Sequence, residues 1–146
     1  MKVYQKIVLA VELDPSCDTI TTKKAKALAD EFGAQLYLVH AIEHMSSYGA
    51  AYGVAAGADI EEMLLENASD SMKKQGSELG LSEDHQVIKV GPARTIILEE
   101  ADRIGADLII VGSHGRHGIR LLLGSTANAV LHGAACDVLA VRLKED

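Results

Sequence analysis

The chain has 146 residues, 48% of them hydrophobic, which is enough for one domain with a sizeable buried core. Acidic residues outnumber basic ones by 21 to 14, giving a formal net charge of −7. This balance argues against general binding to nucleic acid or to anionic membranes, because phosphate groups attract basic surface. No apolar run approaches the roughly 18 residues of a membrane span. The first run, Ile7–Val11, is also too short for a signal peptide, so we expect a cytoplasmic protein.

The first part of the chain predicts a strand, a helix and a second strand. Val3–Val11 contains the run Ile-Val-Leu-Ala-Val without helical periodicity, which is typical of a strand covered on both faces. Asp14-Pro15-Ser16 then provides a helix start, and an apolar stripe continues to Phe32 before Gly33 ends the helix. Gln35–Ile42 is predicted to be the second strand.

The middle of the chain predicts a loop, a long helix and a third strand. Glu43–Gly57 is rich in glycine and alanine and is expected to be a loop. The following helix is indicated by a mostly apolar stripe at helical spacing, formed by Ile60, Leu64, Ala68, Met72, Gln75 and Leu79. Gly80 ends this helix, and Gln86–Val90 is a short third strand.

The last part continues the same alternation. A third helix is indicated by Ile96, Ile97, Glu100, Ala101 and Ile104, and Gly105 ends it. Leu108–Val111 is predicted as the fourth strand, Ser125–Ala135 as the fourth helix and Val138–Leu143 as the fifth strand. Regular strand–helix alternation favours right-handed crossovers and a doubly wound parallel sheet, here in one domain over residues 1–146.

A glycine-rich stretch follows the fourth strand and suggests an anion site. The apolar run breaks at Gly112, and the predicted loop closes at Gly124-Ser125-Thr126, where a helix begins. Such loops present backbone N–H groups to anions. Neither the P-loop pattern nor the dinucleotide fingerprint is present. If strands one and four are neighbours, a crevice beyond their carboxyl ends is framed by Glu12–Asp14 and by 112–126.

Several side chains near this crevice have two readings. Ser125 is interpreted as the cap of the last helix, with contact to a phosphate as a compatible second role. Glu12 and Asp14 are more simply a solvated strand end and helix start than an acid–base pair. His114 and nearby histidines lack the further ligands of a metal site, so no metal-binding or catalytic residue is predicted. Cys136 is interpreted as a small buried hydrophobe rather than a redox sensor.

Motifs spread along the whole chain resemble one known family. They are Ile7–Val11, Leu38–Ile42, Gly91, Asp107–Gly118, Gly124–Leu131 and Cys136–Val141. On these residues the chain is similar to the universal stress proteins. The resemblance implies an α/β fold with a single open five-stranded parallel sheet, order 3-2-1-4-5, and helices on both faces, of the adenine nucleotide alpha hydrolase-like type. It also implies a homodimer formed through the last strand, at Val138, Leu139, Ala140 and Val141.

Some members of this family bind ATP, and the resemblance implies where a nucleotide would lie here. The implied contacts are Ala10, Val11, Glu12, Ala41, Val111, Gly112, Gly115, Arg116, Gly124, Ser125 and Thr126, with ATP and Mg²⁺ as the expected ligands. The ATP-binding members have nine residues between the second and third motif glycines, whereas eight separate Gly115 from Gly124 here. Glu12 also stands where those members usually have Asp, and Asp14 where Ser is common.

Three hypotheses about function follow from the sequence. The first is a cytoplasmic, dimeric, non-catalytic stress-response protein that binds an adenine nucleotide (ATP, ADP or AMP) at the ends of strands one and four. The second is a dimerisation or interaction module without a nucleotide, as the shorter spacer suggests. The third is a slow ATP hydrolase, which would need a metal ion and a water-activating base, with Glu12 or Asp14 as candidates.

Overall fold

One parallel five-stranded sheet forms the centre of the protein. The computed structural model describes residues 3–43, 54–114 and 125–143. Within these residues the strands are β1 (Lys6–Ala10), β2 (Gln35–Ile42), β3 (Gln86–Val90), β4 (Leu108–His114) and β5 (Asp137–Leu143). Their spatial order is β3-β2-β1-β4-β5, and each pair is parallel. The predicted strand order 3-2-1-4-5 is therefore confirmed.

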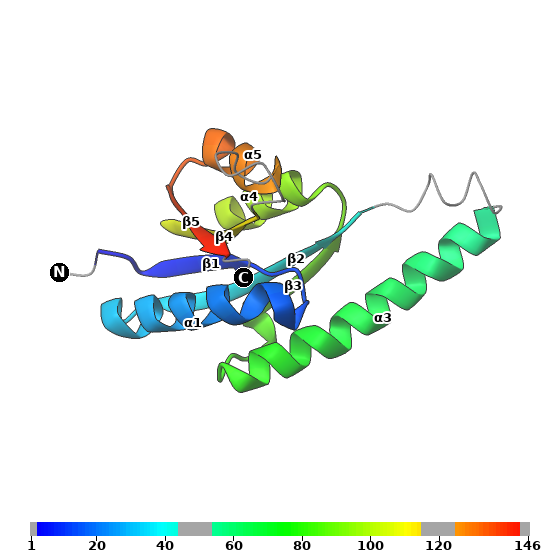
Figure 1. Ribbon diagram of the computed structural model, residues 1–146, viewed down its shortest axis with the longest axis horizontal. Helices are drawn as coiled ribbons and strands as arrows, with labels where there is room; N and C mark the ends of the chain where they lie inside the picture. The colour runs from blue at the N-terminus through cyan, green and yellow to red at the C-terminus, as the bar shows by residue number, and fades with distance from the viewer. Residues whose placement is uncertain (1–2, 44–53, 115–124, 144–146) are drawn as a thin grey trace.

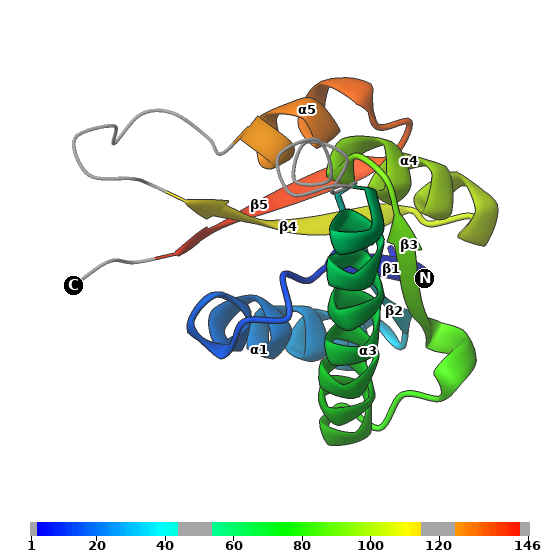
Figure 2. The ribbon, with the colours of Figure 1, turned by 90° about the vertical axis from the view of Figure 1, so that its right-hand side faces the viewer.

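Helices cover both faces of this sheet, as predicted (Figures 1 and 2). They are α1 (Pro15–Phe32), α3 (Val54–Glu78), α4 (Ala93–Ile104), α5 (Ser125–Gly133) and the short 3₁₀ turn η1 (Glu83–His85). Figure 1 shows α1 and α3 on one side of the sheet and α4 and α5 on the other. Each strand is joined to the next through a helix, which is the connection that parallel strands require.

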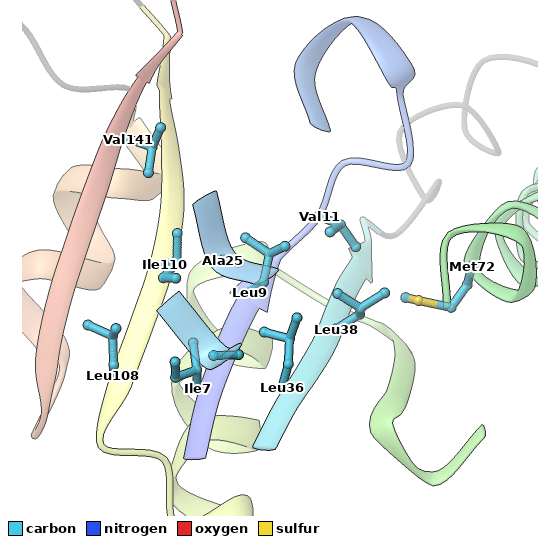
Figure 3. Close-up of a cluster of buried hydrophobic side chains, with 11 residues drawn as sticks. Ile7, Leu9, Val11, Ala25, Leu36, Leu38, Met72, Leu108, Ile110 and Val141 are labelled. Atoms are coloured by element: carbon cyan, nitrogen blue, oxygen red, sulfur yellow. The ribbon is translucent and has the colours of Figure 1, made fainter. Parts of the chain in front are cut away.

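The core has two layers because the central strands are apolar on both faces. Alternate residues Ile7 and Leu9 of β1 point to the α1 face, where they pack with Ala25 of α1 and Met72 of α3 (Figure 3). Val8 points the other way, into a cluster with α4 and α5. Ile7, Val8 and Leu9 are completely buried. The apolar run in β1 is uninterrupted because helices cover both faces of the strand, as predicted.

Two predicted boundaries before residue 60 are wrong. Strand β1 begins at Lys6 rather than at Val3, which is 60% exposed. Helix α3 begins at Val54, so the last residues of the predicted loop 43–57 are helical, while 44–53 lie outside the described residues. The alanines here suit a helix as well as a loop, and an apolar stripe starting at Ile60 could not show how far the helix extends before it.

Two further boundaries differ around the glycine-rich stretch. Strand β4 continues to His114, because Gly112, Ser113 and His114 pair with the last three residues of β5. Gly112 therefore lies inside a strand. The predicted break at this glycine had suggested a loop, and that prediction is wrong. Helix α5 ends at Gly133, two residues earlier than predicted. Pairing between strands that are distant in sequence decides such ends, and local composition does not show it.

Candidate functional site

The order of the strands reverses between β1 and β4. From β1 the chain passes through α1 to β2 on one side, and from β3 it passes through α4 to β4 on the other side. In open parallel sheets, ligands bind beyond the carboxyl ends of the two strands at such a reversal. The predicted neighbourhood of the first and fourth strands is therefore confirmed, and the candidate site lies at this edge.

Strand register shows which predicted residues meet there. Leu9 pairs with Ile110, so Val11 and Gly112, each two residues further along, reach the same edge. Ala10 pairs with Val39, which brings the end of β2 and Ala41 to that edge as well. The structure thus brings together the predicted residues of β1, β2 and β4.

Small side chains occupy the accessible positions of this edge. Ala10, Ala41 and Gly112 are each partly exposed, whereas Val11 and Val111 are 4% and 2% exposed. The two valines are part of the core, so only their backbone is suited to meeting a ligand. Ala10 and Ala41 pack against the core cluster on the α4 and α5 face. The space beside Gly112 is filled by Leu143 and Thr21, whose nearest atoms lie 3.3 Å and 3.4 Å from where a Cβ would stand.

The turn after β1 is fixed by a residue that the sequence interpretation missed. The buried carboxylate of Asp18, in the first turn of α1, accepts the backbone N–H of Glu12 at 3.0 Å and of Leu13 at 2.7 Å. Leu13 has a φ of 62°, a left-handed conformation that costs a non-glycine residue about 1–2 kcal/mol. Two hydrogen bonds to a charged group offset this cost. An acidic residue in the first turn of a helix was the available signal.

Two more polar groups surround this turn. Gln75 of α3 donates a hydrogen bond from Nε2 to Asp18 Oδ2 at 2.8 Å. His40 of β2 donates from Nδ1 to the carbonyl oxygen of Val11 at 2.7 Å. The turn is thus held from α1, α3 and β2 together. Glu12 and Asp14 are exposed at its surface, as the solvated reading of these carboxylates predicts.

Part of the predicted anion site falls outside the described residues, namely Gly115, Arg116 and Gly124. Ser125 is exposed and Thr126 is half-buried, and both lie in the first turn of α5. Ser125 is the first residue of that helix, so it stands one position inside the capping position that the sequence suggested. The helix nevertheless begins where predicted.

The Cys136 thiol lies away from this edge, directly before the start of β5. Burial raises the pKa of the Cys136 thiol, and the nearby carboxylates of Asp137, Asp107 and Asp102 raise it further. A raised pKa disfavours the reactive thiolate, which agrees with the reading of Cys136 as a packed side chain rather than a sensor. It packs against the cluster between the sheet and α4 and α5.

No group of three or more His, Cys, Asp or Glu side chains in residues 3–43, 54–114 and 125–143 is arranged to hold a metal ion. Across the same residues, no helix has both the length and the apolar character needed to cross a membrane.

The predicted dimer strand, β5, forms one edge of the sheet. Leu139 is 37% exposed, Val138 and Ala140 are half-buried, and Val141 is 4% exposed and packs into the core. Strand β5 hydrogen-bonds to β4 on one side. Its other side has no neighbouring strand in the described part of the chain, and such an edge can pair with another chain.

These features define a doubly wound α/β protein whose candidate ligand site lies at the edge of the sheet where the strand order reverses. The sequence profile of the universal stress protein family matches residues 3–142. Universal stress protein A homolog 2 of Coxiella burnetii is 64% identical over 141 residues, which cover 97% of each chain. The chain belongs to the universal stress protein family.

Solved structures agree with this assignment. The structure of hypothetical protein MJ0577 has a TM-score of 0.78 and 27% identity, with 98% of this chain and 99% of that one covered. A universal stress protein crystallised in complex with cAMP has a TM-score of 0.64 and 25% identity, with 97% and 98% covered. The fold is the adenine nucleotide alpha hydrolase-like fold of these proteins.

Proposed function

We propose that this protein is a non-catalytic stress-response protein that binds an adenine nucleotide in the crevice between the ends of β1 and β4. One observation supports the site above all: the strand order reverses between β1 and β4, and the small residues Ala10, Ala41 and Gly112 lie at that edge of the sheet. A family member crystallised with cAMP supports an adenine nucleotide as the class of ligand.

The groups at this edge suit the two ends of a nucleotide. The first turn of α5, with Ser125 and Thr126, offers backbone N–H groups and the positive end of the helix dipole to phosphates. On the opposite side, the exposed carboxylate of Glu12 can accept hydrogen bonds from ribose hydroxyls. Mg²⁺ bound to ATP would reduce the repulsion between its phosphates and the acidic residues Glu12 and Asp14.

We further propose that the protein acts in the cytoplasm as a homodimer paired along β5. The exposed Leu139 and the unpaired side of this edge strand support that interface.

A second candidate function is an interaction module that binds no nucleotide. The exposed carboxylates of Glu12 and Asp14 support it, because both bring negative charge to the edge that would receive phosphates. The spacer of eight residues between Gly115 and Gly124 supports it as well.

Isothermal titration with ATP and Mg²⁺ separates the two candidates. Saturable binding supports the nucleotide function, and no heat at millimolar ATP, ADP, AMP and cAMP supports the interaction module. In the binding case, Gly124→Val should abolish binding by blocking the approach of phosphate to the backbone. The control is Leu131→Val, which introduces a valine near the end of α5 and should leave the affinity unchanged. Phosphate release above the buffer rate, lost in Gly124→Val, would contradict the non-catalytic part of the proposal.

A further inference from the structure

The buried carboxylate of Asp18 contacts two parts of the chain that are far apart in sequence. Its Oδ1 accepts the N–H of Glu12 at 3.0 Å, and its Oδ2 accepts the N–H of Leu13 at 2.7 Å. The same Oδ2 accepts Nε2 of Gln75, on α3, at 2.8 Å. One carboxylate oxygen is therefore shared between the turn after β1 and a helix on the face of the sheet.

The contact with Asp18 determines how the Gln75 side chain is oriented. Gln75 Oε1 is buried and has no hydrogen-bond partner within the described residues, so the amide is held through Nε2. A buried acceptor without a partner is unfavourable. The orientation is kept in spite of this cost, because the alternative would turn the carbonyl oxygen of Gln75 toward a carboxylate.

The turn itself depends on the same carboxylate. Leu13 has a φ of 62°, which a leucine adopts only when its surroundings impose it. Asp18 supplies acceptors to two successive N–H groups, and this fixes the two peptide planes on either side of Glu12, directly before the left-handed Leu13. The exposed side chain of Glu12, at the edge of the crevice, takes its direction from this backbone.

A movement of Gln75, near the end of α3, would also move the first half of this helix. Its second half packs on the sheet through Ala68 and Met72, which are 7% and 2% exposed. Its first half extends beyond the sheet, as Figure 1 shows, and exposes Met63, Leu64 and Leu65. A small rotation of α3 at Gln75 becomes a larger displacement at the start of this helix of 25 residues.

We propose that Asp18 is a positioning residue that ties α3 to the turn at the edge of the crevice, so that the two move together. The ligand half of this statement rests on the proposed nucleotide function. The mechanical half does not, because it concerns contacts present in the protein alone. When a ligand reorients the Glu12–Leu13 backbone, Asp18 follows through its two hydrogen bonds and shifts Gln75 and α3.

Amide hydrogen exchange tests the mechanical half without any ligand. In Gln75→Met, Asp18 loses a donor, and the amides of Glu12 and Leu13 should exchange about tenfold faster. Met also removes the unpartnered Oε1, so the stability of the fold should not fall in parallel. This combination distinguishes a positioning role from a merely structural one.

Gln86→Met is the matched control for this experiment. Gln86 is also half-buried beside α3, and its Nε2 donates to the carbonyl oxygen of Leu81 at 3.1 Å. The same substitution there should leave the Glu12 and Leu13 amides at the wild-type exchange rate. Wild-type rates in Gln75→Met, or an equal acceleration in Gln86→Met, would overturn the proposal.

Nucleotide titration tests the ligand half. Asn at position 18 has the size of Asp but turns an NH₂ donor toward one of the two backbone N–H groups, so Asp18→Asn should weaken ATP binding about tenfold. Gln75→Met should also weaken it, although Gln75 lies on α3 and not at the strand ends. If Asp18→Asn does not fold, the ATP affinity of Gln75→Met decides the ligand half, since this variant retains the Asp18 carboxylate.

The outcomes separate this proposal from the proposed function. If the wild type binds no adenine nucleotide, the proposed function fails, and the exchange rates still decide the role of Asp18. If the wild type binds ATP and both variants bind it equally well, the function stands and the positioning role is overturned.

Discussion

Glu100 of α4 and Lys89 of β3 form an ion pair of 3.0 Å between Oε2 and Nζ, although the Glu100 side chain is only 3% exposed. Arg103, one turn further along α4, donates to the other carboxylate oxygen from Nε at 2.9 Å and from Nη2 at 2.7 Å. Both oxygens of a buried carboxylate are therefore paired. The position of Glu100 in the apolar stripe of its helix, visible in the sequence, is explained by these two cations.

Removal of this carboxylate should destabilise the protein moderately. Lys89 and Arg103 are 50% and 57% exposed, so both can return to water when Glu100→Ala removes their partner. We expect a loss of about 1–3 kcal/mol in the free energy of unfolding, measured with urea. Glu99→Ala, on the exposed side of the same helix, should change it by less than about 0.5 kcal/mol. Equal effects in the two variants would show that the pairing adds nothing.

The same group makes stability depend on acid. Burial of the Glu100 carboxyl opposes its ionisation, but hydrogen bonds from Arg103 and Lys89 outweigh this effect and hold its pKa below the ordinary value of 4.5. A pKa lowered by folding contributes stability above the unfolded pKa, and the contribution is lost as the pH falls through the folded pKa. The difference in unfolding free energy between wild type and Glu100→Gln should be constant from pH 8 to about pH 5 and should shrink below about pH 4. A difference that stays constant down to pH 3 would contradict this assignment.

A charge on the edge strand tests the proposed dimer. In Leu139→Lys, an ammonium group replaces a side chain that is 37% exposed on β5, and its desolvation should oppose pairing with a second strand. We expect the mass measured by light scattering to fall from dimer to monomer. Met63→Lys puts the same charge on α3, at a side chain that is 60% exposed, and should remain dimeric. A dimer that persists in Leu139→Lys places the interface elsewhere.

Cys136 should react slowly with thiol reagents. Its raised pKa, caused first by burial and then by the carboxylates of Asp137, Asp107 and Asp102, leaves less thiolate at neutral pH. In a Cys17→Ser background, labelling by a disulfide reagent at pH 7.5 should be slower than that of free cysteine. Asp137→Asn removes one nearby negative charge and should accelerate it. Labelling as fast as free cysteine would argue for a sensor role.

Much of the architecture could be predicted because it depends on local patterns. The bounds of β2 and β3 agree with the prediction, since both are short apolar runs between clear breaks. Gly105 ends α4 with a φ of 78°, in the left-handed conformation expected for a glycine at that position. The end of β4 was not predictable, because its last three residues are strand only through pairing with β5.

The candidate site shows the same division. Ala10, Glu12, Ala41 and Gly112 were predicted from position and from family resemblance, and the structure brings all four to one edge. Asp18 was missed, although it lies in a helix start that was recognised. No spacing rule connects an aspartate in α1 with a glutamine 57 positions later, so their contact could not be seen in the sequence.

By itself, the sequence determined the class of fold and the family, because apolar periodicity, helix-ending glycines and family motifs are local properties of the chain. The strand order followed only from the family resemblance. Only the tertiary structure decided which polar groups meet inside it. The pairing of Glu100 with Lys89 and of Asp18 with Gln75 depends on how α4 and α3 pack across the sheet. The physical reason is that a buried charge must find partners wherever packing places them, and packing brings together residues that are far apart along the chain.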